Sequence, residues 1–218
     1  MERNVDMTEI SDGKRYTSND LAKLGCGDCA GCSKCCHGMG ESIILDPYDI
    51  YNLTINLNMT FNELLKEMLS LSVKDMIILP HLNLKAEEEG CLFLDENGRC
   101  SIHSFRPGIC RLFPLGRIYE DDSFSYFLQT NECAKTNRTK VKIKKWLGIP
   151  NLNEYENYIN TWHYFLKNMK AFLEEQNNES IAKKINVYIL KIFFEEPYKD
   201  EDFYTQFSQR MQKMQHMF

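Results

Sequence analysis

The cysteines of this sequence are clustered, and their spacing constrains the fold more than any other feature. Five of the nine cysteines lie between Cys26 and Cys36, three lie between Cys91 and Cys110, and the last is Cys133. In the first group a cysteine occupies every third position until the vicinal pair at its end. A C-x2-C step lets a tight turn direct two sulfurs toward one ion. The pattern therefore predicts bound metal.

The rest of the sequence gives these cysteines a setting in which disulfides are not expected. Residues 1–25 hold scattered charges and no apolar block, so neither a secretory signal nor a transit peptide is predicted. No apolar run approaches the roughly 20 residues of a membrane-spanning helix, so we expect a cytoplasmic protein without a membrane partner. Cytosolic thiols stay reduced, which favours metal ligands over a disulfide network or clustered free thiols. The net charge of −5 argues against nucleic acid as a partner.

Eight cysteines remain when Cys26 is omitted, which is the number that two four-sulfur sites use. The vicinal cysteines Cys35 and Cys36 are expected to point in different directions and so to serve two neighbouring centres. Cys91 and Cys100 are expected to face each other across a hairpin. Spacing leaves zinc and an iron–sulfur cluster as alternatives, with the C-x2-C-x2-C run slightly favouring iron–sulfur. The predicted metal ligands are Cys29, Cys32, Cys35, Cys36, Cys91, Cys100, Cys110 and Cys133.

Positive side chains near the cysteines are the second part of the predicted site. A centre bound by four thiolates carries a charge of roughly −2 and needs nearby cations or N–H donors. Arg106 and Arg111 lie within a few residues of Cys110 and are predicted to bind the cofactor. His37 and His103 are expected to be hydrogen-bond partners before nitrogen ligands.

The fold class predicted from the pattern is α+β, a small Cys-ligated metal-binding domain with short β-hairpins followed by a helical C-terminal region. The domain prediction is an N-terminal segment over 1–25, the metal-binding domain over 26–138 and the helical region over 139–218. Capping signals and periodicity predict helices over 19–24, 47–53, 60–70, 140–147, 153–176, 179–195 and from 200 onward. A strand is predicted over 76–79, and hairpins over 91–102 and 115–128.

Basic residues gather around the predicted helix at 140–147. A solvated helix face is the simpler interpretation. The sharper hypothesis is a site for an anionic group, such as a cofactor carboxylate or RNA. The residues concerned are Lys135, Arg138, Lys140, Lys142, Lys144 and Lys145.

The segment from Cys29 to Cys36 resembles the CxxCxxCC signature of YkgJ-type cysteine-cluster proteins, and residues 90–94, 98–103 and 106–114 resemble its second signature. The resemblance implies a zinc- or iron-chelating domain. The cysteine pattern is also similar to that of flagellin lysine N-methylases. That similarity implies a 4Fe–4S cluster, S-adenosylmethionine as cofactor, methyl transfer to a protein lysine, and a protein substrate such as flagellin.

The function predicted from the sequence is metal binding, through an iron–sulfur cluster, zinc or both. Two alternatives stay open beside it. The first is an S-adenosylmethionine-dependent protein lysine N-methyltransferase, and the second is a zinc-stabilised binding module without catalysis.

Overall fold

The computed structural model describes residues 6–27, 32–85, 90–135, 137–199 and 202–215. By its internal contacts the chain forms two compact units. The cysteine unit comprises Glu2–Gly40 and Leu84–Glu156, and it contains every cysteine. The helical unit comprises Glu41–Asn83 and Asn157–Phe218. Each unit therefore combines segments that are far apart in the sequence.

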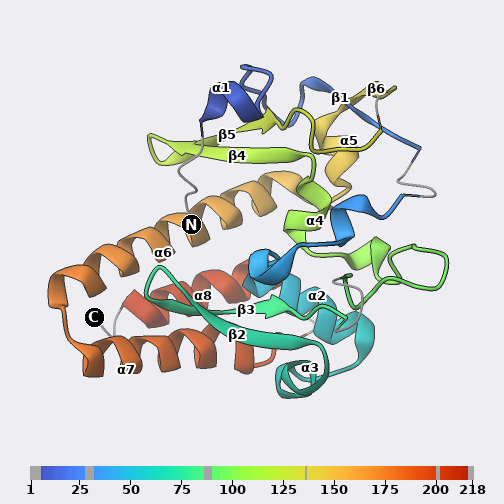
Figure 1. Cartoon of the computed structure of the whole chain (residues 1–218). Helices are drawn as coiled ribbons and strands as arrows, with labels where there is room; N and C mark the ends of the chain where they lie inside the picture. The colour runs from blue at the N-terminus through green and yellow to red at the C-terminus, as the bar shows by residue number, and fades with distance from the viewer. Residues whose placement is uncertain (1–5, 28–31, 86–89, 136, 200–201, 216–218) are drawn as a thin grey trace. The chain divides into compact units, whose positions relative to one another are not determined.

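Two antiparallel hairpin-like ribbons form the strands of the cysteine unit (Figure 1). In the first, β1 (Leu21–Gly25) pairs with β6 (Thr139–Lys142), and in the second, β4 (Leu115–Glu120) pairs with β5 (Ser123–Leu128). The short helices of this unit are α1 (Met7–Ile10), η1 (Lys34–Cys36), η3 (His103–Phe105), α4 (Gly108–Leu112) and α5 (Ile143–Leu147). The hairpin expected over 115–128 is confirmed.

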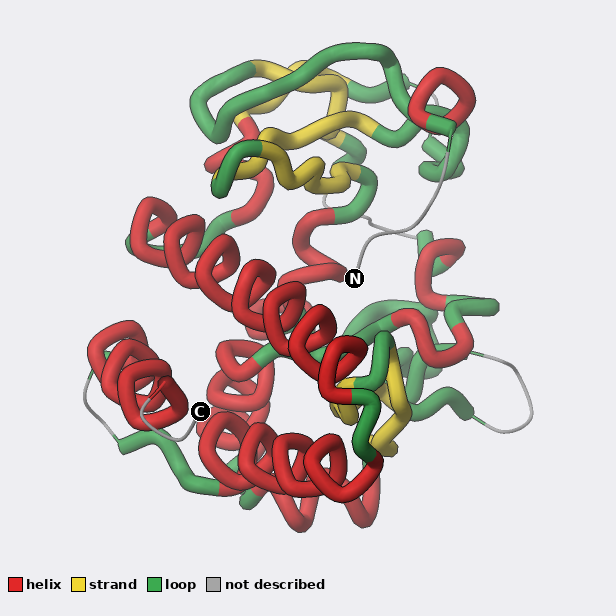
Figure 2. The backbone as a smooth tube through the Cα atoms, turned by 90° about the vertical axis from the view of Figure 1, so that its left-hand side faces the viewer, coloured by secondary structure: helices red, strands yellow, loops and turns green. Residues whose placement is uncertain are grey.

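Helices make up most of the helical unit, as the red segments of Figure 2 show, and a third ribbon is its only described sheet. That ribbon pairs β2 (Leu69–Lys74) with β3 (Ile77–Leu82). The short 3₁₀ turn η2 (Gly40–Ser42) begins at the end of the cysteine unit, and α6 (Leu152–Gln176) also starts in that unit and continues into the helical one. The remaining helices are α2 (Pro47–Leu57), α3 (Phe61–Glu67), α7 (Glu179–Leu190), the π-helical turn η4 (Lys191–Glu195) and α8 (Phe203–Gln215). The predicted α+β fold class with a helical C-terminal region is confirmed.

Local capping signals set the start of the first two helices of this unit. Asp46 and Asp49 form a capping box at the start of α2, with Pro47 in the first turn, and Thr60 and Glu63 form another at α3. Each box satisfies two main-chain N–H groups that the helix itself leaves unpaired. The predicted starts of both helices are confirmed.

Aromatic side chains fill the core of the helical unit. The ring of Trp162 lies 5.0 Å from that of Phe193, and the ring of Tyr158 lies 4.6 Å from that of Phe207, each pair edge to face. All four residues are buried, and edge-to-face pairs add attraction to the burial of apolar area. The apolar stripe expected on the helix over 153–176 is thus a packing surface.

Two helix predictions were wrong because they depended on local signals alone. Residues 21–25 form strand β1, in which Leu21 and Lys23 are exposed while Ala22 and Leu24 are buried. This alternation of exposed and buried residues has the two-residue period of a β-strand. Before this strand, Thr17 and Asp20 close a turn, in which the Asp20 carboxylate accepts from the Thr17 N–H group at 2.7 Å.

The second error concerns residues 139–142, which form β6 before helix α5 begins. Strand β2 was missed as well, because residues 69–70 were assigned to the preceding helix. In both cases the partner strand decides the conformation, and a short isolated segment gives little evidence of its partner. The domain boundaries predicted at 25 and 138 stay a prediction.

No helix within the described ranges combines the length and the apolar character needed to cross a lipid bilayer.

Asn186 connects α7 to the turn between β2 and β3. Its Oδ1 accepts from the Ile78 N–H group at 2.6 Å, and its Nδ2 donates to the carbonyl groups of Met76 and Ala182, both at 3.0 Å. Its side chain is buried, with 5% of the residue exposed.

We expect Asn186→Ala to lower the free energy of unfolding by about 1–3 kcal/mol, because it removes the three hydrogen bonds that a buried side chain makes to main-chain groups. Chemical denaturation followed by circular dichroism measures the change. The control Asn56→Ala removes an amide from the exposed face of α2 and should change stability by less than about 0.5 kcal/mol. Equal effects of the two substitutions would contradict the role of Asn186.

Candidate metal centre

The vicinal cysteines Cys35 and Cys36 lie on the 3₁₀ turn η1. The Cys36 N–H group donates to the Ser33 carbonyl at 2.8 Å, which closes the turn. The two Sγ atoms are 3.9 Å apart and in hydrogen-bond contact. The expectation that they point in different directions was therefore wrong. The tight turn brings neighbouring side chains onto one side of the chain.

A main-chain contact joins this turn to the second group of cysteines. The Cys91 N–H group donates to the Cys36 carbonyl at 2.7 Å, and His37 pairs with Gly90 as an isolated antiparallel bridge. A Cβ atom at Gly90 would lie 3.3 Å from the His37 ring. Glycine at this position thus lets two segments that are distant in sequence approach closely enough to pair.

Cys91 and Cys100 each begin a turn of the same design. The Leu94 N–H group donates to the Cys91 carbonyl at 3.1 Å, and the His103 N–H group donates to the Cys100 carbonyl at 3.2 Å. In each turn the N–H group two residues after the cysteine also donates to its sulfur, from Phe93 and from Ile102. N–H donors of this kind stabilise a thiolate and hold its orientation, as in metal-binding turns.

The hairpin expected over 91–102 is reduced to a single bridge. Leu94 pairs with Cys100, so Cys91 and Cys100 do not face each other across two strands as expected. The reason is that residues 91–94 already close their own turn. Between the two turns, the Asp95 carboxylate accepts from the N–H groups of Asn97 and Arg99 at 2.9 and 2.8 Å.

Cys110 lies on helix α4, and Arg111 anchors that helix to the preceding loop. The Arg111 guanidinium donates to the carbonyl groups of Ser104, Arg106 and Leu147, at 3.1 Å for Arg106 and 3.4 Å for Leu147. These contacts fix the position of Cys110 relative to the turn that follows Cys100. The prediction that Arg111 binds a cofactor stays a prediction.

Arg106 has the features expected of a cation beside a metal centre. Its Nη1 lies 2.6 Å from His103 Nε2, and its guanidinium interacts electrostatically with the thiols of Cys35 and Cys100. Its Nε is buried and has no hydrogen-bond partner among the described residues. A buried donor without a partner is costly, and an anionic acceptor bound at this atom would remove that cost.

Five thiols form one electrostatic neighbourhood, which we call the sulfur cluster. Cys36 interacts with Cys35, Cys91 and Cys110, and Cys100 interacts with Cys91 and Cys35. All five are half-buried and none forms a disulfide. The members of the cluster are Cys35, Cys36, Cys91, Cys100 and Cys110.

The thiols of the cluster differ in pKa. The hydrogen bond from Cys36 lowers the pKa of Cys35 to about 6 despite burial, with smaller help from its own N–H group, Arg106 and His37. The same bond raises the pKa of Cys36 well above its usual range, and burial adds to that rise. Burial also raises the pKa of Cys91 and Cys100. Without metal, one thiolate is therefore shared by a vicinal pair.

The other predicted ligands are less well defined. Cys29 lies outside the described residues. Cys32 and Cys133 are half-buried and form no disulfide. Among the described residues, no contact joins either of them to the sulfur cluster. In the described part of the chain, no three His, Cys, Asp or Glu side chains form a preassembled metal-binding group.

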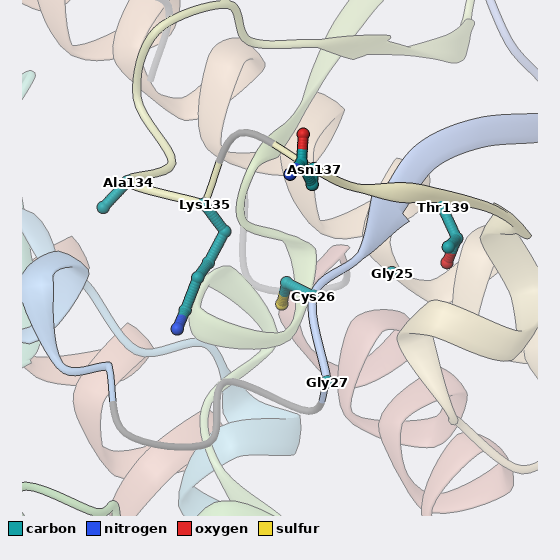
Figure 3. Close-up of a pocket in the computed structure, with 7 residues that line it drawn as sticks. All are labelled: Gly25, Cys26, Gly27, Ala134, Lys135, Asn137 and Thr139. Atoms are coloured by element: carbon teal, nitrogen blue, oxygen red, sulfur yellow. The ribbon is translucent and has the colours of Figure 1, made fainter.

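Cys26 lines a separate pocket with a volume of about 440 Å³. Figure 3 shows Cys26 at the end of β1 and Lys135 beside the same hollow, with Thr139 of β6 further along its wall. Sequence reasoning did not predict the pocket, because it depends on the pairing of β1 with β6.

Comparison with known proteins gives the family. A family model named CxxCxxCC, described as "Putative zinc- or iron-chelating domain", matches residues 28–146, more than half of the chain. The chain belongs to the CxxCxxCC family. The part that matches the CxxCxxCC model includes the whole sulfur cluster, and Cys26 precedes it. No curated protein and no solved structure matches the chain.

In the reduced, metal-free protein we expect Cys35 to be the cysteine of the cluster that is alkylated fastest at neutral pH. Its thiolate fraction should rise as the pH increases through about 6, whereas Cys91 and Cys100 should react only at higher pH. Iodoacetamide labelling followed by peptide mass spectrometry measures each rate.

The substitution Cys36→Ala removes the S–H donor and should move the pH midpoint of Cys35 labelling upward. Cys133→Ala is the matched control and should leave the midpoint unchanged. An unchanged midpoint in Cys36→Ala would contradict the hydrogen-bond explanation.

Proposed function

We propose that this protein binds a metal ion through its sulfur cluster and that zinc is the ion the site suits best. The observation that carries the proposal is the 3.9 Å separation of Cys35 Sγ and Cys36 Sγ. With Zn–S bonds of about 2.3 Å, two sulfurs of a tetrahedral site lie about 3.8 Å apart. A single ion therefore fits both vicinal sulfurs with little movement of the turn.

The turns at Cys91 and Cys100 support the same proposal. Both sulfurs already accept an N–H hydrogen bond from the residue two positions later. The Cys91 turn is tied to the vicinal cysteines by the hydrogen bond from Cys91 to Cys36. Cys35, Cys36, Cys91 and Cys100 are thus our proposed ligands, and Cys110 is a neighbouring fifth sulfur.

Arg106 supports the charge balance of such a site. Four thiolates around a divalent ion leave an excess of two negative charges, which the guanidinium of the half-buried Arg106 partly compensates. Arg106 brings to this role a buried Nε without a partner among the described residues, and its Nη1 donates to His103. Bound zinc supplies cross-links between segments distant in sequence, and that binding energy contributes to folding.

An iron–sulfur cluster is the second candidate. An iron–sulfur cluster uses four cysteine thiolates, as a tetrahedral zinc ion does, so the sulfur cluster holds enough sulfurs for either centre. Hydrogen bonds to sulfur and a nearby cation also suit such a cluster. Methyl transfer from S-adenosylmethionine, with flagellin as a protein substrate, stays a prediction from the sequence resemblance.

We expect the purified protein to be colourless and to contain one equivalent of zinc per chain. The substitutions Cys91→Ser and Cys100→Ser should each weaken zinc binding by about 100-fold or more, since loss of a ligand exceeds the effect of losing an outer partner. Competition with a chromophoric chelator measures the affinity. Cys26→Ser is the matched control and should retain zinc.

Other results of this experiment separate the candidates. If the purified protein is brown and contains equal amounts of iron and acid-labile sulfide, the bound centre is an iron–sulfur cluster and the zinc proposal is wrong. If the protein melts cooperatively at the same temperature before and after complete metal removal, the proposal that metal binding contributes to folding is wrong.

We expect Arg106→Gln to weaken metal binding by about 10- to 100-fold without abolishing it. The reason is that the substitution removes a compensating charge and leaves the thiolates in place. The same chelator competition measures this change. Arg99→Gln removes an exposed arginine from the same region and should have little effect. Equal affinities of the two variants would contradict the charge-balancing role of Arg106.

A further inference from the structure

The exposed side of the β1–β6 ribbon carries lysines in a regular arrangement. The register pairs Leu21 with Lys142 and Lys23 with Lys140, so all four side chains lie on one face. Ala22 pairs with Val141 on the opposite face, where Ala22 is buried. All four residues of the first face are exposed. We call this surface the basic face and define it by Leu21, Lys23, Lys140 and Lys142.

The lysines of the basic face have no counter-charges among the residues that the structure describes. Lys23 and Lys140 are directly opposite each other, an arrangement of like charges that destabilises a strand pair. Neither they nor Lys142 form an ion pair with any described carboxylate. The sequence from residue 133 to 153 contains six basic residues and no acidic one. The charge is therefore concentrated locally in a protein whose net charge is negative.

Protection of an exposed strand edge is the simplest structural reason for lysine on such a ribbon. That purpose is served by a single charge on each strand and does not require two lysines opposite each other. The unfavourable pair Lys23–Lys140 is better explained by an external anion that binds both ammonium groups.

We propose that the basic face binds the phosphate backbone of double-stranded DNA without sequence preference. A two-stranded ribbon is one of the elements that the major groove accommodates. Lys140 and Lys142, two residues apart on one strand, are separated by about 6.7 Å along the strand, so they reach different phosphates. Lysine provides charge without the fixed hydrogen-bond geometry of base recognition.

Other partners fit the basic face less well. Single-stranded nucleic acid is held largely by stacking on aromatic side chains, and the four residues of the basic face include none. Lysine is depleted at the centre of protein interfaces, which disfavours an acidic protein. Phosphate binding through lysine is the usual electrostatic mode of proteins on duplex DNA.

The test is fluorescence anisotropy of a labelled DNA duplex with the full-length, metal-loaded protein over a series of salt concentrations. Contact of three lysines with phosphates predicts that log K falls with log salt with a slope of about −2.7. The double variant Lys140→Glu/Lys142→Glu should reduce the magnitude of the slope by about 2 and weaken binding by at least about tenfold at low salt.

The matched control is Lys183→Glu/Lys184→Glu, which makes the same change in net charge at two exposed lysines of α7. It should bind DNA like the unaltered protein. Folding is checked separately, because Lys140→Glu places an opposite charge across from Lys23 and should preserve or raise the melting temperature. Weaker binding combined with undiminished stability supports the proposal.

Three results would overturn the proposal. The first is absence of salt-dependent DNA binding by the unaltered protein, and the second is an equal loss of binding in both double variants. The third is preferential binding of poly-glutamate, which would assign the basic face to an acidic protein partner.

Discussion

The hydrogen bond from the Cys91 N–H group to the Cys36 carbonyl is the contact on which the sulfur cluster depends. It fixes the vicinal cysteines next to the turns at Cys91 and Cys100, although the two segments are separated in the sequence by much of the helical unit. The bridge between His37 and Gly90 extends this pairing by one residue. Main-chain pairing of this kind orients side chains more tightly than contacts among flexible side chains do, which is what a site with fixed ligand geometry requires.

Hydrogen-bond donors surround this junction. N–H groups serve the sulfurs of Cys91 and Cys100, and the guanidinium of Arg106 lies within electrostatic range of Cys35. Arg111 uses its donors on main-chain carbonyl groups and so holds the helix of Cys110 in place. The two arginines thus have different roles, one electrostatic and one structural, despite similar positions in the sequence.

The sequence correctly predicts those elements whose conformation is determined by residues close to them in the sequence. The helix starts at Asp46 and Thr60, the hairpin over 115–128 and the family signature are all short-range patterns, and all are found as predicted. Strand β1 was misassigned because its identity depends on β6, which lies more than a hundred residues later. The contact between Cys35 and Cys36 was also missed, since spacing defines the type of ligand but not the direction of each sulfur. The cofactor-binding role of Arg106 stays a prediction, and His103, which was expected to be a hydrogen-bond partner, contacts Arg106 Nη1.

The interleaving of the two units determines when the cysteine unit can form during synthesis. Its first segment ends at Gly40, its second begins at Leu84, and β1 pairs only with residues 139–142. The N-terminal thiols therefore emerge from the ribosome long before the strands and turns that surround them. Closing such long loops costs entropy before any contact compensates for it. Until the second segment has been translated, the nascent chain carries only the vicinal cysteines of the sulfur cluster, without the turns at Cys91 and Cys100 that lie beside them in the folded protein.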